Sequence, residues 1–293
     1  MPNDSLILAA YSEIFEQRYI FASVLILLYP VTIVGNMFLI YTICTDRSLH
    51  KPMYILIANL SCIGVYGGLF FTPSVLFCFF TGNYQISRVF CLMQVFNVNT
   101  YGGCEISNLM LMAYDRYISI CFPLNYAAFM TPTKCCITLS LTASLSSCGR
   151  IIEKVYCDNY SLVKLACSDI SHLSIYSTTV TFFSVVLPFF VILYSYLRII
   201  LVCVKLTNSG QTKVIKTCIP HLVAIGNFLI GCSFELYQSR FNMNFMPYTI
   251  RVALSLYFLI VSPAMNPIIY GARTENISNA IYRKMFWTKH FEG

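Results

Sequence analysis

Long apolar stretches with few or no charged residues recur along most of this chain. A helix that crosses a membrane needs about 20 consecutive, mostly apolar residues, and six stretches are of that order, with Glu105 the only Asp, Glu, Lys or Arg inside them. The six are Tyr19–Thr45, Pro52–Ser87 (with a turn near Gly82-Asn83), Val89–Tyr114, Ile170–Leu197, Thr217–Phe234 and Val252–Ala272. A soluble domain could not bury so many such runs, so the pattern predicts an all-α membrane protein.

A seventh stretch, Cys135–Gly149, is shorter and rich in Ser and Thr. Its 15 charge-free residues would reach roughly 22 Å as a helix, against a hydrocarbon core of about 30 Å. Extending it to Ile152 includes Arg150, which is tolerable near an interface because a long side chain can reach the headgroups. The sequence therefore predicts a seven-transmembrane helix bundle whose fourth span is abnormally short.

Composition and charge agree with this interpretation. Charged residues make up 11% of the chain and hydrophobic residues 57%, whereas soluble domains average about 25% charged residues. With seven spans and an outer N-terminus, the inner segments carry twelve basic residues against four acidic ones, and the outer segments carry seven of each. An inner excess of Lys and Arg is typical of membrane proteins. No basic stripe outside the membrane supports binding to nucleic acid.

The two ends of the chain complete the expected organisation. Residues 1–18 contain no basic cluster, so the first span is predicted to be a retained anchor rather than a cleaved signal peptide. Beyond the last span, Ile277, Ile281 and Met285 form an apolar stripe on a helix predicted for Thr274–Lys289, which suits the inner membrane surface. We expect an extracellular N-terminus over 1–18, a seven-transmembrane domain over 19–273, and a cytoplasmic amphipathic helix and tail over 274–293.

The third span ends in a charged motif. Met112 to Cys121 reads Met-Ala-Tyr-Asp-Arg-Tyr-Ile-Ser-Ile-Cys, which puts the carboxylate of Asp115 beside the guanidinium of Arg116 at the inner rim. Such a charge can be held by its neighbour in a resting state and face a partner in an active state. The alternative is a plain interfacial anchor pair.

The last span carries Pro263 and then Asn266-Pro267-Ile268-Ile269-Tyr270. A proline inside a helix removes a backbone hydrogen bond and can kink the helix, and Asn266 could satisfy a freed backbone group inside the bundle. A kink whose freed backbone group can be hydrogen-bonded in two ways is a candidate conformational switch.

Together these motifs resemble odorant receptors of the rhodopsin-like G-protein-coupled class, nearly from end to end. The strings that carry the resemblance are Gly35-Asn36, Leu49 to Tyr54, Met112 to Cys121, Ser195-Tyr196, Lys216 to Leu222 and Pro263 to Tyr270. Lys216 to Leu222 and Tyr156 to Ser161 look more like the fish-type branch. The Asn-Pro-Ile-Ile-Tyr string alone marks only the wide class, and its combination with Met-Ala-Tyr-Asp-Arg-Tyr and Pro-Met-Tyr is specific.

The resemblance implies a receptor that binds a small organic odorant inside the bundle and activates a heterotrimeric G protein of the stimulatory, olfactory type, with no cofactor. It assigns coupling and switching to Asp115, Arg116, Tyr117, Tyr196, Asn266, Pro267 and Tyr270. It also implies two disulfides over the outer mouth, Cys91 with Cys157 and Cys148 with Cys167. Four loop cysteines allow three pairings, and the residues by themselves do not choose among them.

The same resemblance places the odorant pocket between the outer halves of the third, fifth, sixth and seventh spans. It selects Val98, Asn99, Gly102, Gly103, Ile106, Val180, Thr181, Ser184, Phe228 and Cys232. Mostly apolar walls with a few hydroxyl and amide groups fit a small organic ligand. Each of these residues could equally pack the bundle, and Gly102-Gly103 could serve close helix approach.

Glu105 lies ten residues before Asp115, about 15 Å along the helix and near mid-membrane. Placing a carboxyl group there costs free energy, so such a group is by default functional, as an ion ligand or proton carrier. The alternative is a neutral, protonated Glu bonded to a neighbouring polar group. In much of the wider receptor class a second-span Asp shares this region; here Gly64 stands at the matching position, which weakens a sodium site.

The fourth span is the main departure from the family's pattern. A full spanning helix would precede the motif that holds Cys148-Gly149, yet only Thr133 to Ser147 separates it from the preceding loop. About half a helix and part of the loop look deleted. Two consequences are compatible with this: poor folding, or a shift of Cys148 into the membrane with loss of the second disulfide.

Other function classes fit less well. The sequence has no His-Glu pair at helical spacing, Gly-rich phosphate loop or Cys-x-x-Cys pair for an enzyme, and no lysine between Lys216 and Lys284 for an opsin-type Schiff base. A transporter would often show repeated halves, which we do not detect; a non-olfactory small-molecule receptor stays open. Asn3 and Asn159 are N-glycosylation acceptors on the expected outer side.

Overall fold

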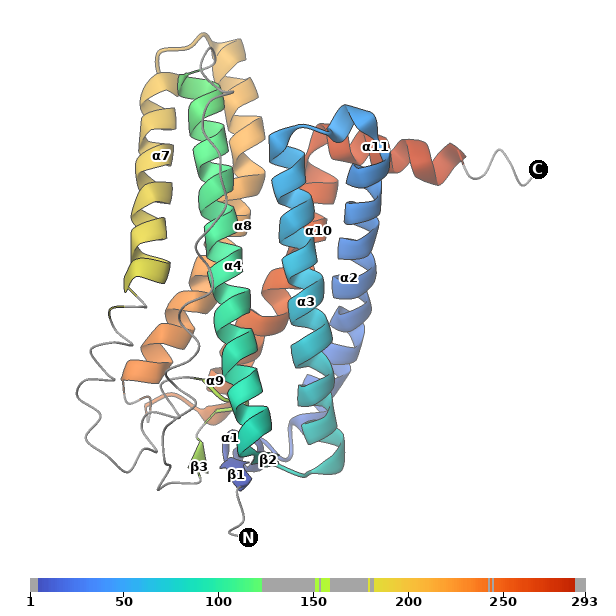
Figure 1. Ribbon diagram of the computed structural model, residues 1–293, viewed down its shortest axis with the longest axis vertical. Helices are drawn as coiled ribbons and strands as arrows, with labels where there is room; N and C mark the ends of the chain where they lie inside the picture. The colour runs from blue at the N-terminus through green and yellow to red at the C-terminus, as the bar shows by residue number, and fades with distance from the viewer. Residues whose placement is uncertain are drawn as a thin grey trace.

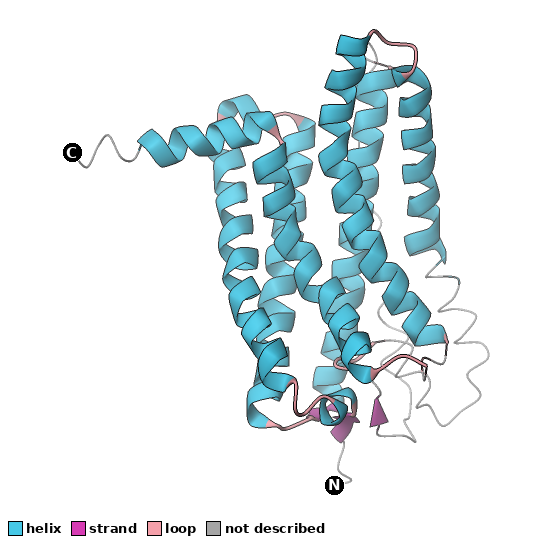
Figure 2. Cartoon of the chain, turned by 180° about the vertical axis from the view of Figure 1, so that it is seen from behind, coloured by secondary structure: helices cyan, strands magenta, loops and turns pink. Residues whose placement is uncertain are grey.

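The computed structural model shows long helices standing side by side (Figures 1 and 2). It describes residues 5–122, 151–152, 154–158, 179, 182–241, 243 and 245–287. The stretch predicted as the fourth span, Cys135–Gly149, lies outside these residues. The long elements are α2 (Arg18–Thr45), α3 (Pro52–Thr81), α4 (Arg88–Cys121), η3 with α7 (Phe182–Val186, Leu187–Cys203), α8 (Asn208–Arg240), α9 with η4 and α10 (Tyr248–Leu256, Tyr257–Val261, Ser262–Arg273) and α11 (Glu275–Trp287).

The two ends of the bundle are named the disulfide end and the Arg116 end. The disulfide end holds the bond between Cys91 and Cys157, and the Arg116 end lies opposite, where α11 projects sideways (Figure 1). The short elements are β1 (Ser5–Leu8), α1 (Ala10–Glu13), η1 (Arg47–Leu49), β2 (Gln85–Ser87) and β3 (Ile151–Ile152).

The first two spans follow the apolar pattern closely. α2 begins one residue before the predicted stretch and ends with it at Thr45. α3 starts at Pro52, which suits the first turn because its missing N–H has no intrahelical partner there. It ends at Thr81, and the C-cap residue Gly82 has a φ of 63°, a left-handed conformation that favours glycine. The turn predicted near Gly82-Asn83 is confirmed.

Several helices, α7 and α9 among them, extend beyond their predicted apolar stretches. α4 continues past Tyr114 to Cys121, and α8 extends from Asn208 to Arg240 around the predicted Thr217–Phe234. The 34 residues of α4 span about 51 Å, well beyond the about 30 Å of hydrocarbon. Charged residues mark where a helix leaves the membrane, whereas backbone hydrogen bonding continues through them until a cap ends it.

The last span is one continuous helical path with a change of geometry. A π-helical turn, η4, joins α9 to α10 immediately before Pro263. Four described stretches are long and apolar enough to cross a membrane: Arg18–Thr45, Pro52–Thr81, Asn208–Gln238 and Tyr248–Arg273. α7 is a shorter apolar helix, and α4 carries Glu105, Asp115 and Arg116 within its length.

Apolar and polar side chains are distributed between surface and interior as expected for a protein in a lipid bilayer. Large apolar side chains such as Leu27, Val34 and Leu201 are more than 60% exposed, whereas Asn36, Glu105 and Asn266 are almost completely buried. Water would penalise such an apolar surface, and hydrocarbon penalises exposed polar groups instead. The bundle is therefore helical and apolar outside, with a few polar groups buried in a mainly apolar interior.

A small sheet closes the disulfide end. β1 pairs antiparallel with β2, with Ser5 opposite Ser87, and parallel with β3, with Ile7 opposite Ile151. The hydroxyl of Tyr11 donates to the carbonyl of Val155 at 2.9 Å. The segment before the first span is thus tied to the segment that carries Cys157.

Candidate functional site

The charged motif of α4 forms an ion pair at the Arg116 end. Nη2 of Arg116 lies 2.6 Å from Oδ2 of Asp115, and its Nε lies 3.1 Å from the same oxygen. The Asp115 side chain is 3% exposed and that of Arg116 is 19% exposed. The carboxylate therefore faces the bundle while the guanidinium reaches the boundary.

Arg116 lines a cavity of about 980 Å³ that opens at this end. Its walls come from α3, α4, α8, α10 and α11. Four further basic residues share it with one acidic residue, Glu275; the basic ones are Lys51, Lys213, Lys216 and Arg273. A cavity with this charge balance can take an acidic or carboxylate-terminated partner.

Aromatic residues of the predicted switch lie beside this cavity. Tyr270 is fully buried, and its hydroxyl lies 3.4 Å from Nδ1 of His221, a cavity residue on α8. Tyr196 of α7 is 6% exposed, and Tyr117 has its ring centroid 6.0 Å from that of Tyr194. Residues from α4, α7, α8 and α10 therefore converge at one end, although the sequence distributes them over more than 150 positions.

The backbone carbonyl that Pro267 leaves without a partner accepts a hydrogen bond from a residue that the sequence did not indicate. Pro267 has no N–H to donate to the carbonyl of Pro263, four residues earlier. Nδ2 of Asn36, on α2, donates to that carbonyl at 3.0 Å. Asn266 does not fill this role, because its Nδ2 lies 3.4 Å from Oε1 of Glu105 instead.

Glu105 lies at the centre of a polar group inside the bundle. Oε1 also lies 3.4 Å from Oγ of Ser262, and Oε2 is buried without a hydrogen-bond partner among the described residues. A Cβ at Gly64 would lie 3.2 Å from Nδ2 of Asn36. The place opposite Gly64 is therefore filled by an amide rather than by a second carboxylate.

The predicted ligand residues are brought together only in part. Ile106, Phe228 and Cys232 are buried. The ring centroids of Phe228 and Phe258 lie 5.8 Å apart. A Cβ added at Gly102 would lie 3.6 Å from Cζ of Phe258. A Cβ at Gly103 would meet no atom of the described residues within 4 Å.

The remaining ligand residues give no common site. Nδ2 of Asn99 donates to the carbonyl of Val95 in its own helix at 2.8 Å, and Val98 packs on the core. Val180, Thr181 and the side chain of Ser184 lie outside the described residues.

At the disulfide end, the bond between Cys91 and Cys157 is confirmed. The backbone N–H of Cys157 donates to Oε1 of Gln94 at 3.0 Å, which fixes the segment on α4. Cys148, Cys167, Asn3 and Asn159 lie outside the described residues, so the second predicted disulfide and both glycosylation sites stay predictions.

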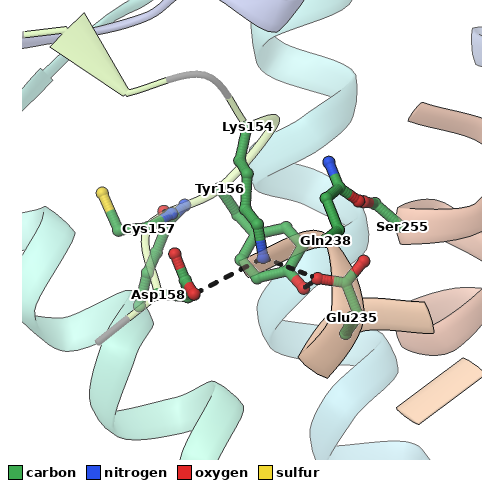
Figure 3. Close-up of polar contacts among 8 residues, drawn as sticks. Lys154, Tyr156, Cys157, Asp158, Glu235, Gln238 and Ser255 are labelled. Carbon is green, nitrogen blue, oxygen red and sulfur yellow. Dashed lines mark hydrogen bonds and ion pairs between the residues drawn. The ribbon is translucent and has the colours of Figure 1, made fainter. Parts of the chain in front are cut away.

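The segment around Cys157 also binds α8, an interaction that the sequence analysis missed (Figure 3). Nζ of Lys154 lies 2.9 Å from Oε2 of Glu235 and 3.4 Å from Oδ2 of Asp158, and the hydroxyl of Tyr156 donates to the same Glu235 oxygen at 2.5 Å. Burial by itself lowers the pKa of Lys154, but the two carboxylates outweigh it and the pKa is raised. Burial, and then Glu235, raise the pKa of Tyr156 well above its ordinary value. No local pattern could have joined residues 81 positions apart.

Comparison with known proteins identifies the family. The family model described as olfactory receptor matches residues 25–289. The chain is similar to olfactory receptor 4K2 of Homo sapiens, with 33% identity covering 94% of this chain and 91% of that protein. It is 32% identical to olfactory receptor 1A1 of Pan troglodytes and to olfactory receptor 1496 of Rattus norvegicus, in each case over 92% of this chain and 91% of the relative. A family match over most of the chain and relatives of this length and identity show that the chain belongs to the olfactory receptor family, whose members are multi-pass receptors of the plasma membrane.

Proposed function

We propose that this receptor binds a small organic odorant within the bundle near the disulfide end and activates a heterotrimeric G protein at the Arg116 end. The observation that carries the proposal is the basic cavity around Arg116. A guanidinium held by a neighbouring carboxylate can exchange that partner for an acidic or carboxylate group of an incoming protein. The excess of positive charge around the cavity favours such a partner over a neutral one.

The membrane orientation follows from the same charge distribution. The basic cavity faces the cytoplasm and the Cys91–Cys157 disulfide faces the outside, where oxidising conditions preserve it. The proposed organisation is then an outer N-terminus over residues 1–18, spans within 19–273, and a cytoplasmic segment over 274–293. The G protein is proposed to be of the stimulatory, olfactory type, as the family resemblance implies.

The proposed ligand end rests on the aromatic group of Phe228, Phe258 and Tyr101, and on Gly103, where no atom of the described residues would lie within 4 Å of an added Cβ. Apolar walls with few polar groups suit a small organic molecule. For the switch we propose Asp115, Arg116, Tyr117, Tyr196, Asn266, Pro267 and Tyr270, as the family resemblance implies. Asn266 lies beside Glu105, and Tyr270 lies beside the cavity residue His221, which supports a link between the two regions.

The test is nucleotide exchange on an added stimulatory G protein by the purified receptor, against a panel of odorants. Arg116→Ala should abolish exchange while ligand binding and surface level change little, because the guanidinium lies at the cavity. Lys205→Ala is the matched control, since Lys205 is an exposed basic residue beyond α7 at the same end. Full exchange by Arg116→Ala would refute the coupling role. Ligand uptake into vesicles without exchange would favour a transporter.

A further inference from the structure

A buried arginine at the disulfide end has no counter-ion among the described residues. Arg251, in the first turn of α9, is 5% exposed. Among the described residues, its buried Nε has no hydrogen-bond partner and no Asp or Glu lies within ion-pair distance of it. The guanidinium carbon lies 4.7 Å from the centroid of the Tyr248 ring. Buried charges in proteins are ordinarily paired, because removing a charge from water is expensive.

Among the described residues at this end, two buried or half-buried acids already have a basic partner. Glu235 and Asp158 both pair with Lys154 (Figure 3). Glu13 of α1, which packs near α9, is exposed and forms no ion pair with Arg251. The N-terminus of α9 adds partial positive charge, since its N-cap Pro247 provides no side-chain cap. The positive charge of Arg251 is therefore reinforced rather than compensated.

Arg251 lies on the face of the last span that looks into the bundle. Ser255, one turn further along, donates to Oε1 of Gln238 on α8 at 3.1 Å (Figure 3). Phe258 follows on the same face, against Tyr101 and Phe228. The face thus presents a guanidinium, then neutral polar groups, then aromatic rings. Arg251 and Phe258 are separated by roughly 10 Å along the helix.

We propose that Arg251 is the anion-binding residue of the ligand site, and that the receptor takes small carboxylic acids whose apolar tail lies toward Phe258. This inference rests on the proposed function, whose odorant class it names. A carboxylate suits the site because its two oxygens can accept two parallel N–H bonds from one guanidinium. Ser255 and Gln238 offer neutral hydrogen-bonding groups beside it. A neutral amide or ester of the same skeleton would leave the buried charge without a partner.

The test measures the melting temperature of the purified receptor in nanodiscs, in a low-salt buffer free of carboxylate anions, with straight-chain carboxylic acids and their primary amides. We expect the acids to raise it and the amides to leave it unchanged. Arg251→Gln should weaken acid binding by about 30-fold or more. Arg251→Lys keeps the charge but loses the two parallel N–H donors of the guanidinium, and it should weaken binding less. Arg88→Gln is the matched control, a half-buried arginine at the start of α4.

Several outcomes would overturn the inference. They are equal stabilisation by acid and amide, undiminished acid binding by Arg251→Gln, equal stabilisation by chloride alone, or no effect of any acid. The acid and amide comparison uses the native chain, so it stands even if Arg251→Gln does not fold. Nucleotide exchange driven only by uncharged odorants would reject the acid class and leave the proposed receptor function intact. Binding of acids without nucleotide exchange would support the acid class and reject the proposed receptor function.

Discussion

The amide of Asn36 replaces the hydrogen bond that Pro267 cannot make. Its Nδ2 donates to the carbonyl of Pro263 at 3.0 Å, across 227 residues of sequence. Gly35 allows this approach, because a Cβ there would lie 3.0 Å from Cγ of Pro267. The kinked last span is therefore held against α2 by one polar contact and one close packing contact.

Asn36→Leu should destabilise the receptor by about 1–3 kcal/mol, because it leaves a buried carbonyl unsatisfied. The measurement is the melting temperature in detergent. Asn99→Leu is the control, since among the described residues that amide bonds to its own helix, and its loss should cost less. Equal losses in both variants would mean that the contact with Pro263 has no special weight.

Lys154 and Glu235 should behave as a buried ion pair. Lys154→Met or Glu235→Gln alone leaves one charge buried without its main partner, which typically costs about 3–5 kcal/mol. The double variant should lose less than the sum of the two, and flow cytometry of tagged cells together with melting temperatures would show this. Strictly additive losses would contradict direct coupling.

The same pair should be insensitive to pH in the physiological range. Because the pKa of Lys154 is raised in the folded protein, its stabilising effect is complete below the unfolded pKa of about 10.4 and is lost only as pH rises through the folded value. The difference in melting temperature between the native chain and Lys154→Met should therefore stay constant from about pH 6 to 8. A difference that declines across that window would contradict the raised pKa.

Cys91→Ser and Cys157→Ser should reduce surface expression equally, and the double variant should be no worse than either. Removing one end breaks the same bond as removing both. Cys62→Ser, at an exposed cysteine within α3, is the control and should have little effect. Surface staining of non-permeabilised cells gives the comparison, and an additive loss in the double variant would argue for separate roles.

The short fourth stretch predicts a trafficking defect from sequence alone. Inserting six apolar residues after Leu145 should raise surface expression, because a deficit of roughly 8 Å at fractions of a kcal/mol per Å can consume several kcal/mol. Six inserted Ser and Gly residues are the control. A native chain that already reaches the surface as well as the insertion variant would show that the short stretch is tolerated.

The sequence by itself determined which segments meet lipid and what family the chain belongs to. Apolar runs are a local property, set by the solvent around each helix, so α2 and α3 lie where the pattern predicts. The motifs of α4 and α10 are likewise contiguous strings. Helix ends were less predictable, because the charges at Asp115 and Arg116 end the apolar run without ending the backbone hydrogen bonding of α4.

Only the tertiary structure decided which polar groups meet across the bundle. Asn36 rather than Asn266 satisfies Pro263, Lys154 pairs with Glu235, and Arg251 is left without an acid among the described residues. These outcomes depend on how helices rotate and approach each other, and therefore on the packing of many apolar side chains at once. A charge or an amide in the sequence shows that a partner is needed, and the packing selects the partner.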